Sequence, residues 1–569
     1  MNRVRLMDGL ALLVLFCLGL WIRLPLLPLL DFSSDATDPI ISALRMLESL
    51  NFFQGDSARF GYGRSLSYVP LVFSMEDGLG GFAVRRMVAQ ALIAPVTYLS
   101  VRMLLSAPSS SRESTIDDVA GVLCSFAAGL LLVVNQDLLQ NLLWGHHGYL
   151  GPEWSALLLL GFCGLLVGRT LRLWSALSGF AFAMCVMNHP YAVALAPILW
   201  VAWSGARQDG DLARARHVLI AASLTALVML PHLVYVLVTP GGREDILESL
   251  VSSSMLSFSN STKILEGLLS NIAAPEAMLF AGSLFWVLLV PVLATSLPQS
   301  SSLGRLIARV SLAVALAFAA LVVLGLVSRQ VHNWHWRMLL PFATLCFALT
   351  LAWLIEQLKT LSRERRSRRL AVFAATAFTV SLLAVVINDG YHSFRDPAKQ
   401  PVESLLQLGQ IERVYGLLER DSGQASWTIM AIGSPPEQSY ARSLPLALHG
   451  VLLPNSSLSL ASSSAEWLQG LTLYYLEGPP VWIDGLFRSL AEVAGSPVWR
   501  GARSLAWRLD SREQALQVAE SICVVSEGLR LRVDSPRDQF ALLEMLGLVT
   551  GSDGLQTPDA PVSCLRLAP

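Results

Sequence analysis

Three aspartates follow the first long apolar segment of the chain, and one of them has no evident structural task. Asp38-Pro39 is typical of a helix start, because Asp caps free backbone N–H groups and Pro suits the first helical turn. Asp35 precedes this cap, so it is a candidate general base or metal ligand at the membrane edge. An ordinary solvated loop residue is the alternative. The helix after Asp38 is predicted to lie along the membrane surface on the apolar face Ile40, Ile41, Leu44 and Leu47.

A second polar cluster combines carboxylates with imidazoles after the third apolar segment. Its candidate metal ligands are Asp137, His146, His147 and Glu153. With Asp35 they suit a divalent cation such as Mn²⁺, Mg²⁺ or Zn²⁺. Neighbouring helix residues point about 100° apart, so at most one of the two histidines faces a common site. Polar residues in the lipid headgroup zone are the alternative interpretation.

A third cluster lies between two late apolar segments and contains His332, Trp334, His335, Trp336 and Arg337. An arginine at the mouth of a membrane span is costly without a partner. Arg337, flanked by aromatic side chains, suits a phosphate at headgroup depth, because its planar guanidinium binds phosphate with two parallel hydrogen bonds. A snorkelling arginine in an aromatic belt is the alternative.

Membrane-spanning helices must position these clusters. Only 15% of the residues are charged, and the mean hydropathy is +0.53. A bilayer core of about 30 Å needs about 20 apolar residues per helix, which predicts about eleven transmembrane helices within residues 1–390. The predicted spans are 8–27, 82–105, 117–135, 153–168, 173–188, 190–204, 217–238, 276–296, 307–328, 337–358 and 370–388. The break at Asn188-His189-Pro190 is interpreted as a turn between two spans, and a kink is the alternative.

The charges of the loops predict the orientation of these spans in the membrane. With the N-terminus in the cytoplasm, every predicted inside loop carries arginine, whereas the outside loops at 136–152, 188–190 and 329–336 contribute only Arg329. This asymmetry follows the positive-inside rule. The loop 25–81, the loop 239–275 and the tail then lie outside, together with all three polar clusters. We expect a multi-pass protein of a bacterial inner membrane, with its C-terminal domain in the periplasm or outside the cell.

The tail, residues 391–569, is predicted to be a soluble α/β or α+β domain. Strand-like runs start at Trp427 and Leu471, and helical patterns cover 401–418 and 512–521. No internal repeat is visible, which disfavours an inverted-repeat transporter. A net charge of −1, without a basic stretch interleaved with aromatics, gives no reason to expect nucleic acid as a partner.

In combination, the clusters resemble the GT-C superfamily of polyprenyl-phosphate-dependent glycosyltransferases, in particular protein O-mannosyltransferases and lipid A aminoarabinose transferases. The resemblance rests on four stretches: Asp35 with Ala43–Glu48, Tyr68-Val69-Pro70-Leu71, Arg85-Arg86, and His335-Trp336-Arg337-Met338-Leu339-Leu340-Pro341. The chain departs from the family pattern at Ala36, where many relatives have a second acidic residue, and at Trp336, where Tyr is usual. The oligosaccharyltransferase motif Trp-Trp-Asp-Tyr-Gly is missing.

The resemblance implies transfer of a sugar from a polyprenyl-phosphate donor to a hydroxyl of a protein, lipid or glycan acceptor. Asp35 would act as general base, and Arg337 with Arg85, Arg86 and His335 would bind the lipid phosphate. Two other classes stay open. A transporter or flippase predicts ionisable residues in the middle of spans, and these spans are nearly free of charge. A non-catalytic relative acting as a binding or assembly subunit fits the missing second carboxylate.

Overall fold

The computed structural model describes the greater part of the predicted membrane region and five short strands of the tail. The described residues are 2–30, 32, 39–40, 42–44, 46–47, 62–73, 78–106, 118–143, 150–168, 170–238, 302–328, 333–361, 408–409, 427–432, 458–460, 471–477, 499–500 and 504–509. His335 and Gln140 are among residues whose backbone alone is described.

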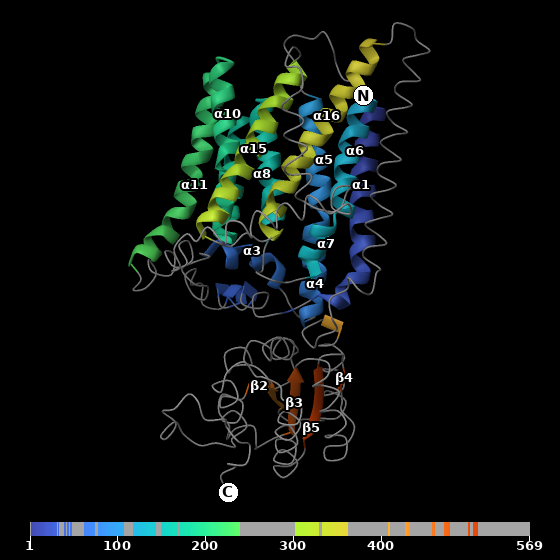
Figure 1. The fold of residues 1–569 in the computed structure, drawn as a ribbon, viewed down its shortest axis with the longest axis vertical. Helices are drawn as coiled ribbons and strands as arrows, with labels where there is room; N and C mark the ends of the chain where they lie inside the picture. Colours follow the sequence, from blue (N-terminus) through green and yellow to red (C-terminus); the bar gives the residue numbers. More distant parts are fainter. Residues whose placement is uncertain are drawn as a thin grey trace.

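Long helices packed side by side form a bundle (Figure 1). Its first half contains α1 (Asn2–Arg23), η1 (Leu24–Leu29), α3 (Tyr62–Val72), α4 (Gly78–Ala91), α5 (Ile93–Leu105), α6 (Asp118–Val134), α7 (Gln136–Leu143) and α8 (Gly151–Val167). Its second half contains α9 (Leu171–Asn188), η3 (Pro190–Leu195), α10 (Ala196–Gln208), α11 (Leu212–Val238), α15 (Ser302–Ser328), η6 (Asn333–Leu339) and α16 (Leu340–Leu361).

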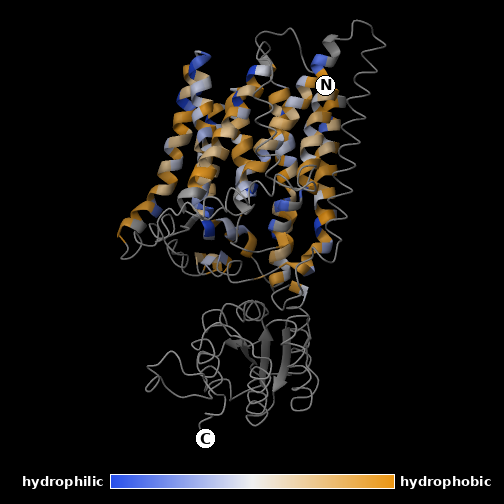
Figure 2. Cartoon of the chain, in the orientation of Figure 1, coloured by the Kyte–Doolittle hydropathy of each residue, from blue (hydrophilic) through white to orange (hydrophobic). Residues whose placement is uncertain are grey.

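Six of the described helical segments are long and apolar enough to cross a membrane, or seven if the bent pair α6 and α7 is one span. They are Val4–Leu29, Leu79–Leu105, Leu171–Asn188, Leu212–Val234, Leu303–Leu324 and Trp336–Gln357. All six fall on segments that the sequence predicts as spans. Figure 2 shows hydrophobic residues along these helices and hydrophilic residues gathered towards their ends. The predicted spans at 276–296 and 370–388 lie outside the described residues.

The break after α9 is a reversal of the chain. Thr225 Oγ1 on α11 donates to Gly179 O on α9 (3.0 Å), and Ser175 Oγ on α9 lies 3.1 Å from Nδ1 of His217 on α11. These pairs advance together along both helices, so α9 and α11 are parallel and the intervening η3 and α10 run back between them. The predicted span 190–204 is not one continuous helix. Pro190 starts the 3₁₀ segment, and a separate 13-residue helix follows.

The short helix predicted after Asp38 is present, and its buried face differs in part from the predicted one. The described residues between 39 and 47 are helical. Ile40 and Ala43 are fully buried and Met46 is 3% exposed, whereas Leu44 and Leu47 are only partly buried. The apolar face therefore runs along Ile40, Ala43 and Met46, a spacing of three residues that also follows helical periodicity.

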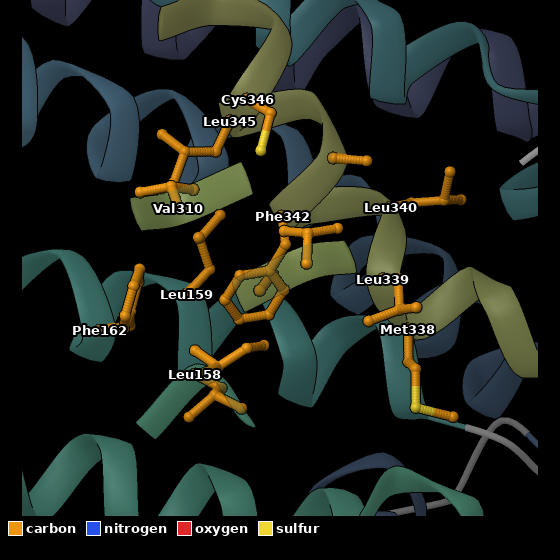
Figure 3. Packing of buried hydrophobic residues seen from close by; sticks show 14 of the residues in the cluster. Leu158, Leu159, Phe162, Val310, Met338, Leu339, Leu340, Phe342, Leu345 and Cys346 are labelled. Carbon is orange, nitrogen blue, oxygen red and sulfur yellow. The ribbon is translucent and has the colours of Figure 1, made fainter. Parts of the chain in front are cut away.

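A continuous apolar core links α8, α15 and α16. Figure 3 shows Phe342 of α16 between Leu158, Leu159 and Phe162 of α8, with Val310 of α15 nearby. The rings of Phe162 and Phe342 meet edge to face at 6.1 Å. This packing fixes the start of α16, and with it the 3₁₀ segment η6 that carries Arg337.

Ion pairs lie at the end of the bundle that is opposite to η6. Arg309 of α15 donates two hydrogen bonds to Asp209 (2.6 and 2.7 Å), at the turn between α10 and α11. These bonds lower the pKa of Asp209. Arg102 on α5 pairs with Asp8 on α1 at 3.0 Å.

The described part of the tail contains five strands: β1 (Trp427–Ile432), β2 (Leu458–Leu460), β3 (Leu471–Glu477), β4 (Trp499–Arg500) and β5 (Ser504–Leu509). They form one sheet in the order β2-β1-β3-β5-β4. β1 is parallel to β2 and β3, and β5 is antiparallel to β3 and β4. The strands predicted at Trp427 and Leu471 are therefore neighbours. The helical pattern at 512–521 lies outside the described residues, so the helix content of this domain stays a prediction.

Candidate functional site

Arg337 is buried at the end of the bundle that also contains α4 and α7. It lies on η6 and is 7% exposed. The next residue ties η6 to α8, because the hydroxyl of Ser155 donates a hydrogen bond to the backbone oxygen of Met338. Trp336 packs against Phe318 of α15, with ring centroids 5.7 Å apart. The guanidinium is therefore held by elements packed on both sides, whereas a snorkelling arginine would extend into water.

Arg86 approaches Arg337 from a different helix. It lies on α4, is 3% exposed, and donates through Nη2 to the backbone oxygen of Asn141 at 2.9 Å. Arg337 donates through Nη1 to the side-chain Oδ1 of the same Asn141 at 3.3 Å. Two arginines that are distant in the sequence thus share one asparagine on α7.

Arg85 points elsewhere, as neighbouring helix positions must. Its Nε donates to the backbone oxygen of Leu71 at 2.7 Å, so Arg85 caps the C-terminal turn of α3. Its Nη2 is buried and has no hydrogen-bond partner among the described residues. The structure therefore separates the two adjacent arginines: Arg86 joins Arg337, and Arg85 joins α3.

Arg23 extends the basic cluster towards α1. It is 1% exposed and donates through Nε to Gln90 Oε1 (2.7 Å) and through Nη1 to Gly19 O (3.1 Å). Gln90 in turn donates to Leu138 O on α7 (2.6 Å). Arg86 and Gln90 are one turn apart on α4, so one face of α4 binds the backbone of α7 twice.

Glu153 places a carboxylate beside these guanidinium groups. It lies in the first turn of α8, two residues before Ser155. It interacts electrostatically with Arg86 and Arg23, and its buried Oε2 has no hydrogen-bond partner within the described part of the chain. Two cationic neighbours favour this carboxylate as a counter-ion and oppose a divalent cation at the same place.

The predicted metal site has little support from the residues that the structure describes. No group of three or more His, Cys, Asp or Glu side chains among them is arranged to hold a metal. Asp137 lies in the first turn of α7 and is partly buried. His146, His147, His332, Asp35 and Asp38 lie outside the described residues, and the side chain of His335 is not described.

Sequence reasoning missed Arg23, Gln90 and Asn141. One signal was available for Arg23, which ends the first span on the side where arginines are scarce. Gln90 and Asn141 carry no such signal, because a polar amide inside or beside an apolar helix is common in any membrane protein. Only the packing of α4 on α7 brings them to the arginines.

The bundle and its cluster of buried arginines define a multi-pass helical membrane protein with a basic site at one end. No family model matches the chain, and no curated protein does.

Among solved structures the chain is similar to ArnT from Cupriavidus metallidurans bound to undecaprenyl phosphate. The TM-score is 0.49 at 13% identity, covering 89% of this chain and 98% of that one. It is also similar to the Archaeoglobus fulgidus oligosaccharyltransferase AglB in complex with an inhibitory peptide and a dolichol-phosphate. There the TM-score is 0.44 at 12% identity, covering 86% of this chain and 71% of that one.

A second structure of the Archaeoglobus fulgidus oligosaccharyltransferase, in complex with Zn and sulfate, has a TM-score of 0.44 at 12% identity. It covers 85% of this chain and 69% of that one. These proteins are members of the GT-C superfamily, which the sequence motifs resemble. At such identities and TM-scores a shared activity does not follow from the likeness.

Proposed function

We propose that this chain is a membrane glycosyltransferase that moves a sugar from a polyprenyl-phosphate donor to an acceptor hydroxyl at the outer face of a bacterial inner membrane. The observation that carries the proposal is the convergence of Arg86 and Arg337 on Asn141, in a buried site at one end of the bundle. Buried arginine is costly unless an anion accompanies it. Glu153 is one anion beside Arg86 and Arg23. The phosphate of a lipid that enters sideways between helices would add a second at the depth of its headgroup.

In the proposed reaction, Asp35 takes the proton of the acceptor hydroxyl. The acceptor oxygen forms a bond to the anomeric carbon of the sugar, and the bond from that carbon to the phosphate oxygen breaks. Negative charge then grows on the leaving polyprenyl phosphate. Arg337 and Arg86 stabilise this charge through hydrogen bonds that are strongest in the transition state.

Arg85 has a supporting role in the proposed mechanism. Its Nε is engaged with Leu71, while its buried Nη2 has no described partner. It therefore orients α3 next to the site and retains one donor for a ligand. We assign no step to a metal, because the described neighbours of Glu153 are guanidinium groups.

Sugar transfer from a labelled polyprenyl-phosphate donor tests the proposal directly. Replacing Asp35 by Asn is expected to lower kcat about 10²- to 10⁴-fold, the usual contribution of a general base. Replacing Arg337 by Ala is expected to reduce kcat/KM through loss of phosphate contacts in both ground and transition states.

Unchanged transfer by both variants would contradict the mechanism. Wild-type protein that transfers no sugar from any polyprenyl donor would instead favour the binding or assembly subunit. Mass spectrometry of lipid that co-purifies with the chain identifies the donor to be used in the assay.

A further inference from the structure

Glu153 places a negative charge beside the arginines of the candidate site. It interacts electrostatically with Arg86 of α4 and with Arg23 of α1. Its Oε2 is buried and accepts no hydrogen bond from any residue that the structure describes. We propose that Glu153 is a fixed counter-charge that makes the site release the product, polyprenyl phosphate, more readily than the sugar-carrying donor. This inference rests on the proposed function.

The donor and the product differ in the charge of their phosphate. In the donor the phosphate is a diester with one negative charge. Transfer breaks the bond between the sugar and the phosphate oxygen, so the product is a monoester. A phosphate monoester carries a charge of about −1.5 to −2 at pH 7, because its second ionisation occurs near pH 6. A site with guanidinium groups alone would therefore bind the product more tightly than the donor.

A carboxylate near the bound phosphate reduces this preference. Glu153 lies beside Arg86, to which the proposed function assigns the phosphate. Repulsion between carboxylate and phosphate grows in proportion to the charge of the phosphate, so it opposes the product up to about twice as strongly as the donor. Arg86 is 3% exposed and Arg23 is 1% exposed, and charges in such buried surroundings are screened little by salt.

The backbone that carries Glu153 is held on two sides. Glu153 lies in the first turn of α8. The next residue, Trp154, donates through Nε1 to Ser67 Oγ of α3 at 2.9 Å. Ser155 donates through its hydroxyl to the backbone oxygen of Met338 in η6. The charge of Glu153 is therefore anchored close to the arginine site by two neighbouring elements.

The arginines are likewise held by acceptors other than Glu153. Arg86 donates through Nη2 to the backbone oxygen of Asn141 at 2.9 Å. Arg23 donates through Nε to Gln90 Oε1 at 2.7 Å. Glu153 Oε2 accepts from neither arginine, so this oxygen acts on the site through its charge and not through a hydrogen bond. Charge is the property that the experiment changes.

The experiment measures the affinity of the full chain in lipid nanodiscs at pH 8 for two ligands. They are polyprenyl phosphate and methyl polyprenyl phosphate, a diester that carries one charge and no sugar. Glu153→Gln removes the charge and keeps the size of the side chain. It is expected to lower Kd for the monoester about tenfold and Kd for the diester only about threefold. Glu153→Ala, a second neutral variant, should give the same difference between the ligands.

Asp8→Asn is the matched control. Asp8 is a carboxylate paired with Arg102 at 3.0 Å, at the opposite end of the bundle. Loss of its charge should leave Kd unchanged for both ligands.

Product inhibition of sugar transfer gives an independent measurement. With labelled donor, Glu153→Gln is expected to lower the inhibition constant of added polyprenyl phosphate about tenfold, because the product leaves the site less readily. Glu153→Asp retains the charge and should keep this constant within about threefold of the wild-type value.

Equal changes in Kd for the two ligands, or no change for either, would overturn the inference and leave the proposed function intact. Weaker binding of both ligands by Glu153→Gln would also overturn it, and would indicate that Glu153 only stabilises the first turn of α8. Wild-type protein that binds neither ligand would overturn the proposed function and this inference together.

Discussion

At the scale of single residues, the candidate site depends on guanidinium groups that are buried and tied to neutral oxygens. Arg23, Arg86 and Arg337 are each less than a tenth exposed. Their described acceptors include the amide oxygens of Gln90 and Asn141 and backbone carbonyls. Such acceptors fix the direction of each guanidinium, which suits recognition of an anion.

A charge-conserving substitution tests whether the shape of Arg337 matters in addition to its charge. Arg337→Lys keeps the positive charge but loses the planar fork that matches phosphate, so KM for the donor is expected to rise about tenfold. Steady-state kinetics with a labelled donor measures this. Arg102→Lys, at the opposite end of the bundle, serves as the matched control and should leave KM alone. An equal rise in KM for both variants would show that lost packing, and not phosphate recognition, is responsible.

At the scale of elements, α3 is joined to the bundle through one serine. Ser67 Oγ accepts from Trp154 Nε1 at 2.9 Å and from Asn188 Nδ2 at 2.7 Å, and it donates to Gly63 O at 2.7 Å. Helices α3, α8 and α9 therefore meet at this hydroxyl. Trp154 neighbours Glu153 in the sequence, so the same contact helps to orient the first turn of α8 at the site.

Removal of this hydroxyl should be costly, because it leaves the N–H of a partly buried indole without its acceptor. Ser67→Ala is expected to destabilise the protein by about 1–3 kcal/mol, measured by unfolding in detergent micelles. Ser100→Ala is the matched control, since Ser100 is fully buried and its Oγ donates to Val96 O in its own helix. Adding Trp154→Phe to Ser67→Ala should restore part of the loss. A small effect at Ser67, equal to that at Ser100, would refute this role for the contact.

At the scale of the whole molecule, the arginine site and the α10–α11 turn lie at opposite ends of the bundle. Helix α11 connects these ends: it begins after Asp209, which pairs with Arg309, and runs parallel to α9. Helix α9 ends at Asn188, whose amide contacts Ser67 on α3. The C-terminal end of α11 is therefore on the side of the arginine site.

Cysteine labelling at the two ends of α11 tests the proposed orientation. In a cysteine-free background, Val238→Cys, where the native residue is 75% exposed, should react with a membrane-impermeant maleimide added to intact spheroplasts. Gln208→Cys, at an exposed position just before the α10–α11 turn, should react only after permeabilisation. The physical reason is the positive-inside rule, because the turn end carries Arg207, Arg214 and Arg216. Reaction of both cysteines from the same side would exclude α11 as a membrane span.

The sequence by itself predicted features that follow from solvent and local geometry. A bilayer requires apolar helices of a fixed length, so the six described candidate spans fall on predicted segments. The strand-like runs at Trp427 and Leu471 likewise predicted the strands that begin at these residues. Arg337 was identifiable as a candidate, because an arginine at the end of an apolar helix is costly without a partner. Arg86 was a candidate through the resemblance to the GT-C superfamily.

Only the tertiary structure decided which of these charges meet. Asn141, Arg86 and Arg337 are far apart along the chain, and no periodicity relates α4, α7 and η6. The rotation of α4 about its axis decided that Arg86 faces α7 while Arg85 caps α3. The face on which the helix after Asp38 is buried depended in the same way on its neighbours. Buried polar and charged side chains need hydrogen-bond partners, and the sequence shows that such side chains are present. The packing of the helices decides which residues become those partners.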